Sequence, residues 1–249
     1  MGALVVANWK MNGALPQIEG FGERWNALVA TPPVNVTAVV CPPHPYLAHV
    51  IEALSGVELG GQDCSVHPGG AYTGEVAADM LAELGCEWVI VGHSERRRDH
   101  AETDALVAAK AAATVTAGLT AIVCVGESLT QREAGEAEAV VAAQLSGSLK
   151  GLSPDSFVVA YEPVWAIGTG VTATPEQADA MHGMIKRWLI EQFGSAGEQV
   201  AVLYGGSVTP DIAGDLFALE TVDGALVGGA SLDADSFWAI VSAADEGRM

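Results

Sequence analysis

Residues 106–125, LVAAKAAATVTAGLTAIVCV, decide between two ways of folding this chain. The stretch is nearly long and apolar enough for a membrane span, which needs about 20 mainly apolar residues in a row. Polar or flexible residues interrupt it at four positions: Lys110, Thr114, Thr116 and Gly118. Its first part belongs to a helix-like segment at 103–117, and its end, TAIVCV (120–125), is typical of a strand. The stretch therefore predicts a buried helix that leads into a strand, and no membrane association.

The same alternation recurs along the whole chain. Short apolar runs typical of buried strands occupy residues 3–8, 36–41, 57–62, 88–93, 120–125, 157–162, 200–205 and 224–229. Helix-like segments follow them, for example at 77–84, 103–117, 132–149, 175–193 and 234–244. Apolar strands alternating with helices indicate an α/β fold with a parallel sheet covered by helices. Eight such units predict a (β/α)8 barrel, and no linker divides residues 1–249, so we expect a single domain.

A doubly wound open sheet is the alternative fold. Its dinucleotide-binding fingerprint requires three glycines in a fixed pattern after a strand. The GTG at 168–170 continues as Val171, Thr172 and Ala173, without the third glycine. The barrel is therefore the favoured prediction.

The composition excludes several classes of partner. The chain has 11 basic and 31 acidic residues and a formal net charge of -20. Such a chain lacks the basic surface that nucleic acids or anionic membranes require. The four cysteines are widely spaced, with no CxxC pair and no histidine at ligand spacing, so we expect buried, reduced thiols and no metal site. The N-terminal MGALVVANWK lacks the basic region of a signal peptide, which predicts a cytoplasmic protein.

Function in such a barrel is expected where the carboxyl ends of the strands meet the following loops. The polar residues at these ends are few and chemically complementary. They are Asn8 and Lys10 after the first strand, His93 after the fourth, Glu162 at the end of the sixth, and the turns Gly205-Gly206-Ser207 and Gly228-Gly229 after the seventh and eighth. Together they predict one site at one end of the barrel.

Each of these residues also has a simpler structural interpretation. Lys10 could be a surface residue whose stem lies along Trp9, and His93 could be a hydrogen-bonded histidine at a strand end. Glu162 could pair with an arginine, and the glycines could serve only as tight turns. Their coincidence at one end favours a site. Because glycine turns let backbone N–H groups approach an anion, and Lys10 adds a local positive charge, we expect a small phosphorylated ligand.

The segment AYEPVWAIGTG, residues 160–170, has Glu162 as its only acidic or basic side chain. It follows a strand-like run and precedes the helix start at Thr174-Pro175-Glu176. A connection of about a dozen mainly apolar residues is typical of a lid or a binding loop.

Motifs distributed over almost the whole chain resemble those of the triosephosphate isomerase family. They are NWKMN (8–12), CPPHPYL (41–47), GAYTGE (70–75), VGHSERR (91–97), CVGE (124–127), YEPVWAIGTG (161–170), YGGSV (204–208) and LVGGASL (226–232). The resemblance implies the TIM barrel fold. It also implies interconversion of dihydroxyacetone phosphate and D-glyceraldehyde 3-phosphate, without a metal or organic cofactor.

The resemblance implies a role for each candidate residue. Glu162 would be the base that removes a proton next to the substrate carbonyl, with a proton affinity raised by the loss of water. His93 would be a neutral imidazole that polarises the carbonyl, helped by a helix that starts at Ser94. Lys10 and Asn8 would stabilise the enediolate and contact the substrate. The phosphate would bind at the backbone of Gly168, Ser207, Gly228 and Gly229.

The resemblance also implies a lid and a dimer. The lid would comprise Pro163, Val164, Trp165, Ala166, Ile167, Gly168, Thr169, Gly170, Val171, Thr172 and Ala173, with its first three and last three residues as hinges. The commonest family pattern has lysine where this chain has Val171, a position without a chemical role. Residues 62–75 resemble a loop that inserts into a neighbouring subunit, which would bring Thr73 close to Asn8 and Lys10 in a homodimer.

Two other functions remain open at the level of sequence. Another phosphate-binding barrel, such as a ketose-forming isomerase of amino-acid biosynthesis, would share the turns after the last two strands. It would not be expected to combine NWKMN with the YEPVW segment. A non-catalytic relative would be expected to lack the base or the lysine, and both are present here.

Overall fold

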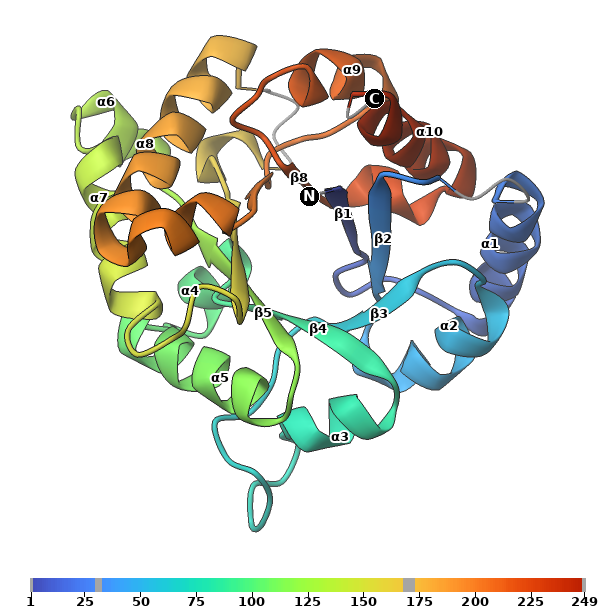
Figure 1. Ribbon diagram of the computed structural model, residues 1–249. Helices are drawn as coiled ribbons and strands as arrows, with labels where there is room; N and C mark the ends of the chain where they lie inside the picture. The colour runs from blue at the N-terminus through green and yellow to red at the C-terminus, as the bar shows by residue number, and fades with distance from the viewer. Residues whose placement is uncertain (1, 30–32, 168–172, 248–249) are drawn as a thin grey trace.

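The computed structural model describes residues 2–29, 33–167 and 173–247. Within these residues, eight parallel strands close into a barrel in the order of the sequence, and helices surround it (Figure 1). The strands are β1 Ala3–Asn8, β2 Val36–Cys41, β3 Glu58–Gly61, β4 Cys86–Val91, β5 Thr120–Val125, β6 Phe157–Tyr161, β7 Val202–Tyr204 and β8 Gly224–Val227. The predicted barrel is confirmed.

Both faces of the strands are buried, which explains why the strands are apolar throughout. On β1, Leu4 and Val6 belong to a cluster made only of residues from the strands and their immediate ends, inside the barrel. Val5 and Ala7 belong to the larger cluster shared with the surrounding helices. Closure is visible at Val5, which pairs with Ala38 of β2 on one side and with β8 on the other.

The helices follow the strands as the pattern predicts. They are α1 Leu15–Leu28, α2 Leu47–Ala53, α3 Ala78–Glu83, α4 Ser94–Asp99, α5 Asp104–Thr116, α6 Leu129–Glu133, α7 Ala137–Ser148, α8 Pro175–Phe193, α9 Pro210–Phe217 and α10 Ala234–Glu246. Short 3-10 turns occupy η1 His44–Tyr46, η2 Val164–Ala166, η3 Gly194–Gln199 and η4 Gly229–Leu232. In the part of the chain that the structure describes, none of the helices has the length and apolarity to cross a membrane.

Several element ends differ from the sequence-based prediction by one to three residues, and two differences have a clear structural cause. The helix expected at 132–149 is divided into α6 and α7, because Gly135 takes a left-handed backbone conformation (φ 75°) between them. Strand β4 ends at Val91 and not at His93, since Gly92 (φ 68°) turns the chain and His93 caps α4. His93 therefore stands at the start of a helix, two residues beyond the sheet.

The four cysteines are free and buried, as expected. The loop between β3 and α3 extends away from the barrel and carries Thr73, whose side chain is exposed (Figure 1).

Candidate active site

A cavity of about 280 Å³ opens at the carboxyl ends of the strands. It lies among loops that follow β1, β4, β7 and β8. The predicted residues that line it are Asn8, Lys10, His93, Gly205, Gly206, Ser207, Gly228 and Gly229. Side chains from opposite ends of the sequence thus meet in one place, as the barrel topology predicts.

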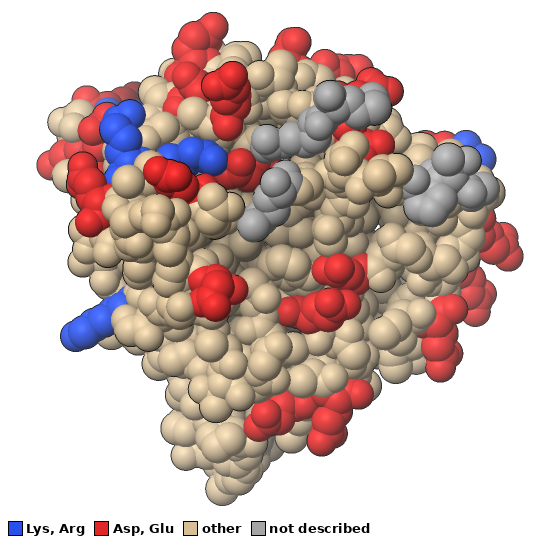
Figure 2. Space-filling model, in the orientation of Figure 1, with Lys and Arg blue, Asp and Glu red and all other residues tan. Residues whose placement is uncertain are grey.

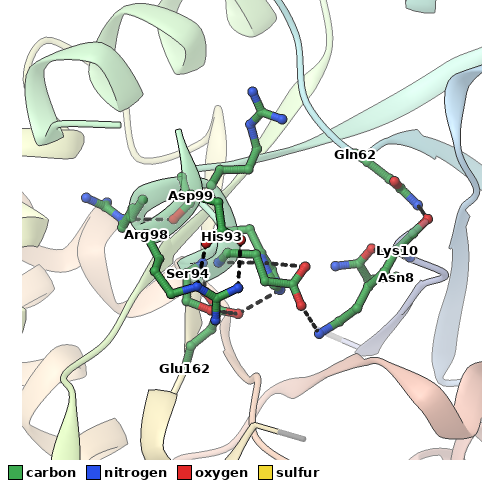
Figure 3. Close-up of polar contacts among 12 residues, drawn as sticks. Asn8, Lys10, Gln62, His93, Ser94, Arg98, Asp99 and Glu162 are labelled. Carbon is green, nitrogen blue, oxygen red and sulfur yellow. Dashed lines mark hydrogen bonds and ion pairs between the residues drawn. The ribbon is translucent and has the colours of Figure 1, made fainter. Parts of the chain in front are cut away.

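Glu162 does not itself line this cavity but contacts His93, which does, and only 1% of its surface is exposed. Its Oε1 is 2.9 Å from His93 Nε2, and its Oε2 accepts a 2.8 Å hydrogen bond from the Ser94 backbone N–H. The Ser94 hydroxyl donates a further bond of 3.2 Å to Oε1 (Figure 3). The carboxylate is therefore held against the start of α4.

The protonation of His93 follows from its neighbours. Its Nδ1 accepts a 3.2 Å hydrogen bond from the Glu95 backbone N–H, so Nε2 carries the ring proton and donates it to Glu162. Burial lowers the pKa of His93, but the adjacent Glu162 carboxylate and, to a smaller extent, Glu95 raise it, and the net direction is above the ordinary value. The backbone N–H that donates to Nδ1 favours the neutral ring, whereas the Glu162 carboxylate favours the protonated ring and so raises the pKa of His93.

The pKa of Glu162 differs from the expectation of a raised value. Burial raises this pKa, but His93, the Ser94 N–H and the nearby Lys10 charge lower it more, so the net direction is downward. In this arrangement the carboxylate is ionised and fully partnered. A raised proton affinity would require Glu162 to leave His93 and Ser94 while staying out of water.

Lys10 reaches the cavity through an unusual backbone conformation. Its φ is 52°, which is uncommon for a residue with a side chain. The Asn8 side chain accepts its backbone N–H at 3.0 Å, and Gln62 donates to its carbonyl at 2.9 Å. Gln62 also donates to the carbonyl of Cys41 at 2.8 Å, which ties this turn to β2. The Lys10 Nζ lies 2.6 Å from Oε1 of Glu95 in α4.

Close contacts require glycine at Gly205 and Gly206 in the turn after β7. A Cβ at Gly206 would lie 2.3 Å from the Tyr204 hydroxyl, and one at Gly205 would lie 2.9 Å from Glu162 Cγ. At Gly228, a Cβ would lie 3.5 Å from Lys10 Cε, so the lysine stem passes close to this turn. Larger side chains would therefore obstruct the wall of the cavity at Gly205 and Gly206.

The first part of the predicted lid is anchored by a buried carboxylate. Glu127 has no exposed surface and accepts hydrogen bonds from Tyr161 (3.1 Å), Trp165 (2.9 Å) and Arg132 (3.1 Å). The Arg132 guanidinium also lies over the Trp165 ring, 4.9 Å from its centre. These contacts fix the segment that follows Glu162.

The later part of the lid is described only in part. Ser207 donates a hydrogen bond of 3.0 Å to the carbonyl of Ala166, which links the lid to the turn after β7. Ile167 lines the cavity. The predicted residues Gly168, Thr169, Gly170, Val171 and Thr172 lie outside the described residues.

Three residues with clear positions in the site were not given a role from the sequence. Gln62 braces Lys10, Ser94 binds the Glu162 carboxylate, and Glu127 anchors Trp165. Their motifs, GGQ, HSER and CVGE, each place a polar residue just after a strand, which is the available signal. In the described part of the chain, His, Cys, Asp and Glu side chains do not form a group of three able to hold a metal ion.

Comparison with known proteins gives a consistent result. The family model described as Triosephosphate isomerase matches residues 3–244. The triosephosphate isomerase of Alkalilimnicola ehrlichii is 52% identical over 247 residues, covering 97% of this chain and 98% of that protein. The enzyme of Thermus thermophilus is 49% identical, covering 96% and 97%. A crystal structure of triosephosphate isomerase from Bartonella henselae superposes with a TM-score of 0.89 at 38% identity, covering 98% and 99%. The chain belongs to the triosephosphate isomerase family.

Proposed function

We propose that this chain interconverts dihydroxyacetone phosphate and D-glyceraldehyde 3-phosphate through an enediolate. The observation that carries the proposal is the pairing of the buried Glu162 with His93, 2.9 Å apart, beside a cavity that Lys10 and the glycine turns also line. Membership of the triosephosphate isomerase family supports it. Such an isomerisation supplies a step of glycolysis and gluconeogenesis.

The reaction needs one base and two groups that stabilise negative charge. Glu162 takes a proton from the carbon next to the carbonyl, and the electron pair of that C–H bond forms the enediolate. The Nε2–H of His93 and the Nζ of Lys10 stabilise the developing oxygen charge, with Asn8 beside them. The Nε2–H of His93 gives its proton to the former carbonyl oxygen and the ring recovers one from the neighbouring hydroxyl, while Glu162 returns its proton to the former carbonyl carbon, so atoms and electrons balance without a redox partner.

For this step Glu162 must turn away from His93 and Ser94 toward the substrate. Turning removes two of the contacts that lower its pKa and leaves burial, which raises it. The same movement removes the carboxylate that raises the pKa of His93. Both changes favour the reaction, because the base gains proton affinity and the imidazole stays neutral.

The substrate phosphate binds at the turns after β7 and β8. Ser207, Gly228 and Gly229 line the cavity with Asn8 and Lys10, and the lysine stem passes beside Gly228. Backbone N–H groups of these turns and the Lys10 charge provide a local anion site in an acidic protein. Gly168 remains a predicted phosphate contact.

Residues 163–173 act as a lid over the bound substrate. The contacts of Trp165 with Glu127 and of Ala166 with Ser207 support a fixed first hinge. A closed lid excludes water and protects the enediolate from losing its phosphate.

The protein forms a homodimer of single-domain subunits that span residues 1–249, and it acts in the cytoplasm. The exposed loop that carries Thr73 supports the dimer, and the four free, buried cysteines support the compartment. Static light scattering at micromolar concentration tests the dimer. The proposal expects twice the 25.6 kDa chain mass, and a monomer would contradict it.

The activity is tested by coupled assays of both directions with purified protein and with Glu162→Asp. This change retracts the carboxylate by one methylene, so we expect kcat to fall by about 100-fold or more with a smaller change in KM. Glu19→Asp makes the same change at an exposed position of α1 and should keep the wild-type kcat. A wild-type kcat in Glu162→Asp would refute the assigned base.

A further inference from the structure

The backbone pairing between β4 and β5 ends just before the site. The last registered pair is Val91 with Val123, so Gly92 and Cys124 would be the next pair. The carbonyls of both accept hydrogen bonds from one side chain, Arg97 of α4. Its Nε donates to Gly92 at 2.8 Å and its Nη2 donates to Cys124 at 3.1 Å. A guanidinium thus bridges the two strand ends where the sheet stops.

This guanidinium is itself fixed from two helices. Its Nη1 donates to Asp104 Oδ1 of α5 at 2.6 Å, and its Nη2 donates to the Ser148 hydroxyl of α7 at 3.1 Å. Only 16% of the Arg97 side chain is exposed. Four donations in different directions require the planar, branched donor set of arginine, which a lysine ammonium on its flexible stem cannot reproduce.

Each bridged carbonyl is connected through the backbone to a proposed catalytic residue. Gly92 immediately precedes His93, and its left-handed conformation is enclosed by Val107, which a Cβ would approach to 2.7 Å. Cys124 precedes Val125, whose carbonyl accepts the Glu162 backbone N–H at 2.7 Å. The spacing between the His93 and Glu162 backbones is therefore set through the β4 and β5 ends that Arg97 joins.

We propose that Arg97 is a positioning residue for proton transfer: by bridging the Gly92 and Cys124 carbonyls, it holds the backbones of His93 and Glu162 at the separation from which Glu162 can turn to the substrate. This inference rests on the proposed isomerase activity for its kinetic consequence. Its structural consequence, the fixed separation of the two strand ends, does not depend on that activity. Because a displacement of about 1 Å at reacting groups can lower a rate by about 100-fold, a small relaxation of this bridge suffices.

The test compares Arg97→Lys with two controls. Arg98→Lys makes the same change at the next residue of α4, where the exposed side chain pairs with Asp99. Ser148→Ala removes one partner of Arg97 but leaves both strand carbonyls bridged. For each variant, kcat, KM and the melting temperature are measured, and the distance between the His93 and Glu162 Cα atoms is determined by crystallography.

We expect Arg97→Lys to lower kcat by about 10- to 100-fold with KM within about twofold of wild type. Both controls should keep kcat within about twofold, although Ser148→Ala should lower the melting temperature. A folded Arg97→Lys protein with wild-type kcat would overturn the inference. The inference would also be overturned if Ser148→Ala lowered both the melting temperature and kcat. The loss of kcat in Arg97→Lys would then follow from lower stability alone.

A second variant and the crystal structures decide the remaining cases. If Arg97→Lys does not fold, Asp104→Asn keeps the arginine but removes its counterion, and we expect a smaller loss of kcat with KM preserved. Wild-type kcat in that variant would contradict the inference. If the wild-type protein shows no turnover, the proposed function fails. The bridge is then tested by whether the distance between the His93 and Glu162 Cα atoms grows in the variant relative to the wild type, and an unchanged distance would overturn it.

Discussion

His182 of α8 is a buried side chain whose protonation is set by its surroundings. It is fully buried, and its Nδ1 lies 3.3 Å from the carbonyl of Thr221, which can only accept, so Nδ1 carries the proton. The ring packs between Tyr161 and Tyr204, with centroid distances of 5.8 and 6.1 Å. Burial lowers the pKa of His182 from 6.5 to about 4. The folded protein therefore keeps this ring neutral.

This pKa predicts a loss of stability in mild acid. Between pH 6.5 and about 4 the unfolded chain binds a proton at His182 that the folded chain does not, so stability falls as the pH falls through this window. Across the whole window, the free energy of unfolding falls by about 3 kcal/mol because of His182. His182→Asn keeps a donor toward Thr221 but cannot be protonated. Its melting temperature should depend less steeply on pH between 6.5 and 4, and an unchanged slope would contradict the prediction.

The residues proposed to carry the chemistry could be selected from the sequence, but their contacts could not. Asn8, Lys10, His93 and Glu162 stand out because each is a polar side chain at the end of an apolar strand. The rest state of Glu162 depends on the direction of its side chain and on where α4 begins. Both are set by tertiary packing, and they place the carboxylate on His93 and Ser94 and lower its pKa.

At the scale of elements, the approach of β5 to β6 positions Glu162. A Cβ at Gly126 would lie 1.8 Å from the Glu162 carbonyl oxygen, which leaves room for glycine alone. Gln144 of α7 encloses the same glycine, accepting its N–H at 2.7 Å and donating to its carbonyl at 2.9 Å. The strand ends are therefore in direct backbone contact beside the site.

Gly126→Ala should disturb both stability and catalysis. A methyl group must push the Glu162 backbone away, so we expect a loss of at least about 2 kcal/mol in the free energy of unfolding and a lower kcat. Gly214→Ala is the matched control, because its Cβ would meet no atom within 4 Å. In the middle of α9 the added methyl should stabilise by about 0.5–1 kcal/mol. Urea unfolding measures both, and equal stabilities of the two variants would contradict this account.

The order and type of elements were predictable because periodicity along the chain reports them. Eight apolar runs separated by helix-like segments allow few topologies, since parallel strands need covering helices. The break between α6 and α7 was missed because Gly135 is one glycine inside an otherwise helical pattern, and its left-handed conformation becomes evident only in the folded chain. The end of β4 was misplaced because His93 completes an apolar run but caps the next helix.

At the scale of the whole molecule, the charge imbalance has to be accommodated by the surface. Acidic side chains lie over much of the face shown in Figure 2, whereas Lys and Arg are sparse there. Most of the Lys and Arg side chains that the structure describes are paired with carboxylates. Lys110, for example, places its Nζ 2.6 Å from a carboxylate oxygen of both Asp63 and Glu102. The formal net charge of -20 therefore leaves mutual repulsion among acidic residues.

Salt should accordingly stabilise the protein. Raising NaCl from about 0.01 M to 1 M shortens the screening length from about 30 to 3 Å, so we expect the melting temperature to rise by a few degrees. The triple variant Glu19→Gln, Glu23→Gln and Glu191→Gln, at three exposed positions, should respond less because it carries less repulsion. Differential scanning calorimetry measures the shift. A melting temperature that is flat or falls with salt would contradict the prediction.

The most direct test of the central claim is incorporation of solvent deuterium by the wild-type protein and by Glu162→Gln. Dihydroxyacetone phosphate is incubated in D2O, and mass spectrometry follows deuterium at the carbon next to the carbonyl. If Glu162 moves the proton, its acidic form exchanges with solvent, so the wild type should incorporate deuterium while Glu162→Gln, which cannot accept a proton, should lose nearly all of it. Incorporation at the wild-type rate in Glu162→Gln would contradict the account and assign the base to another residue.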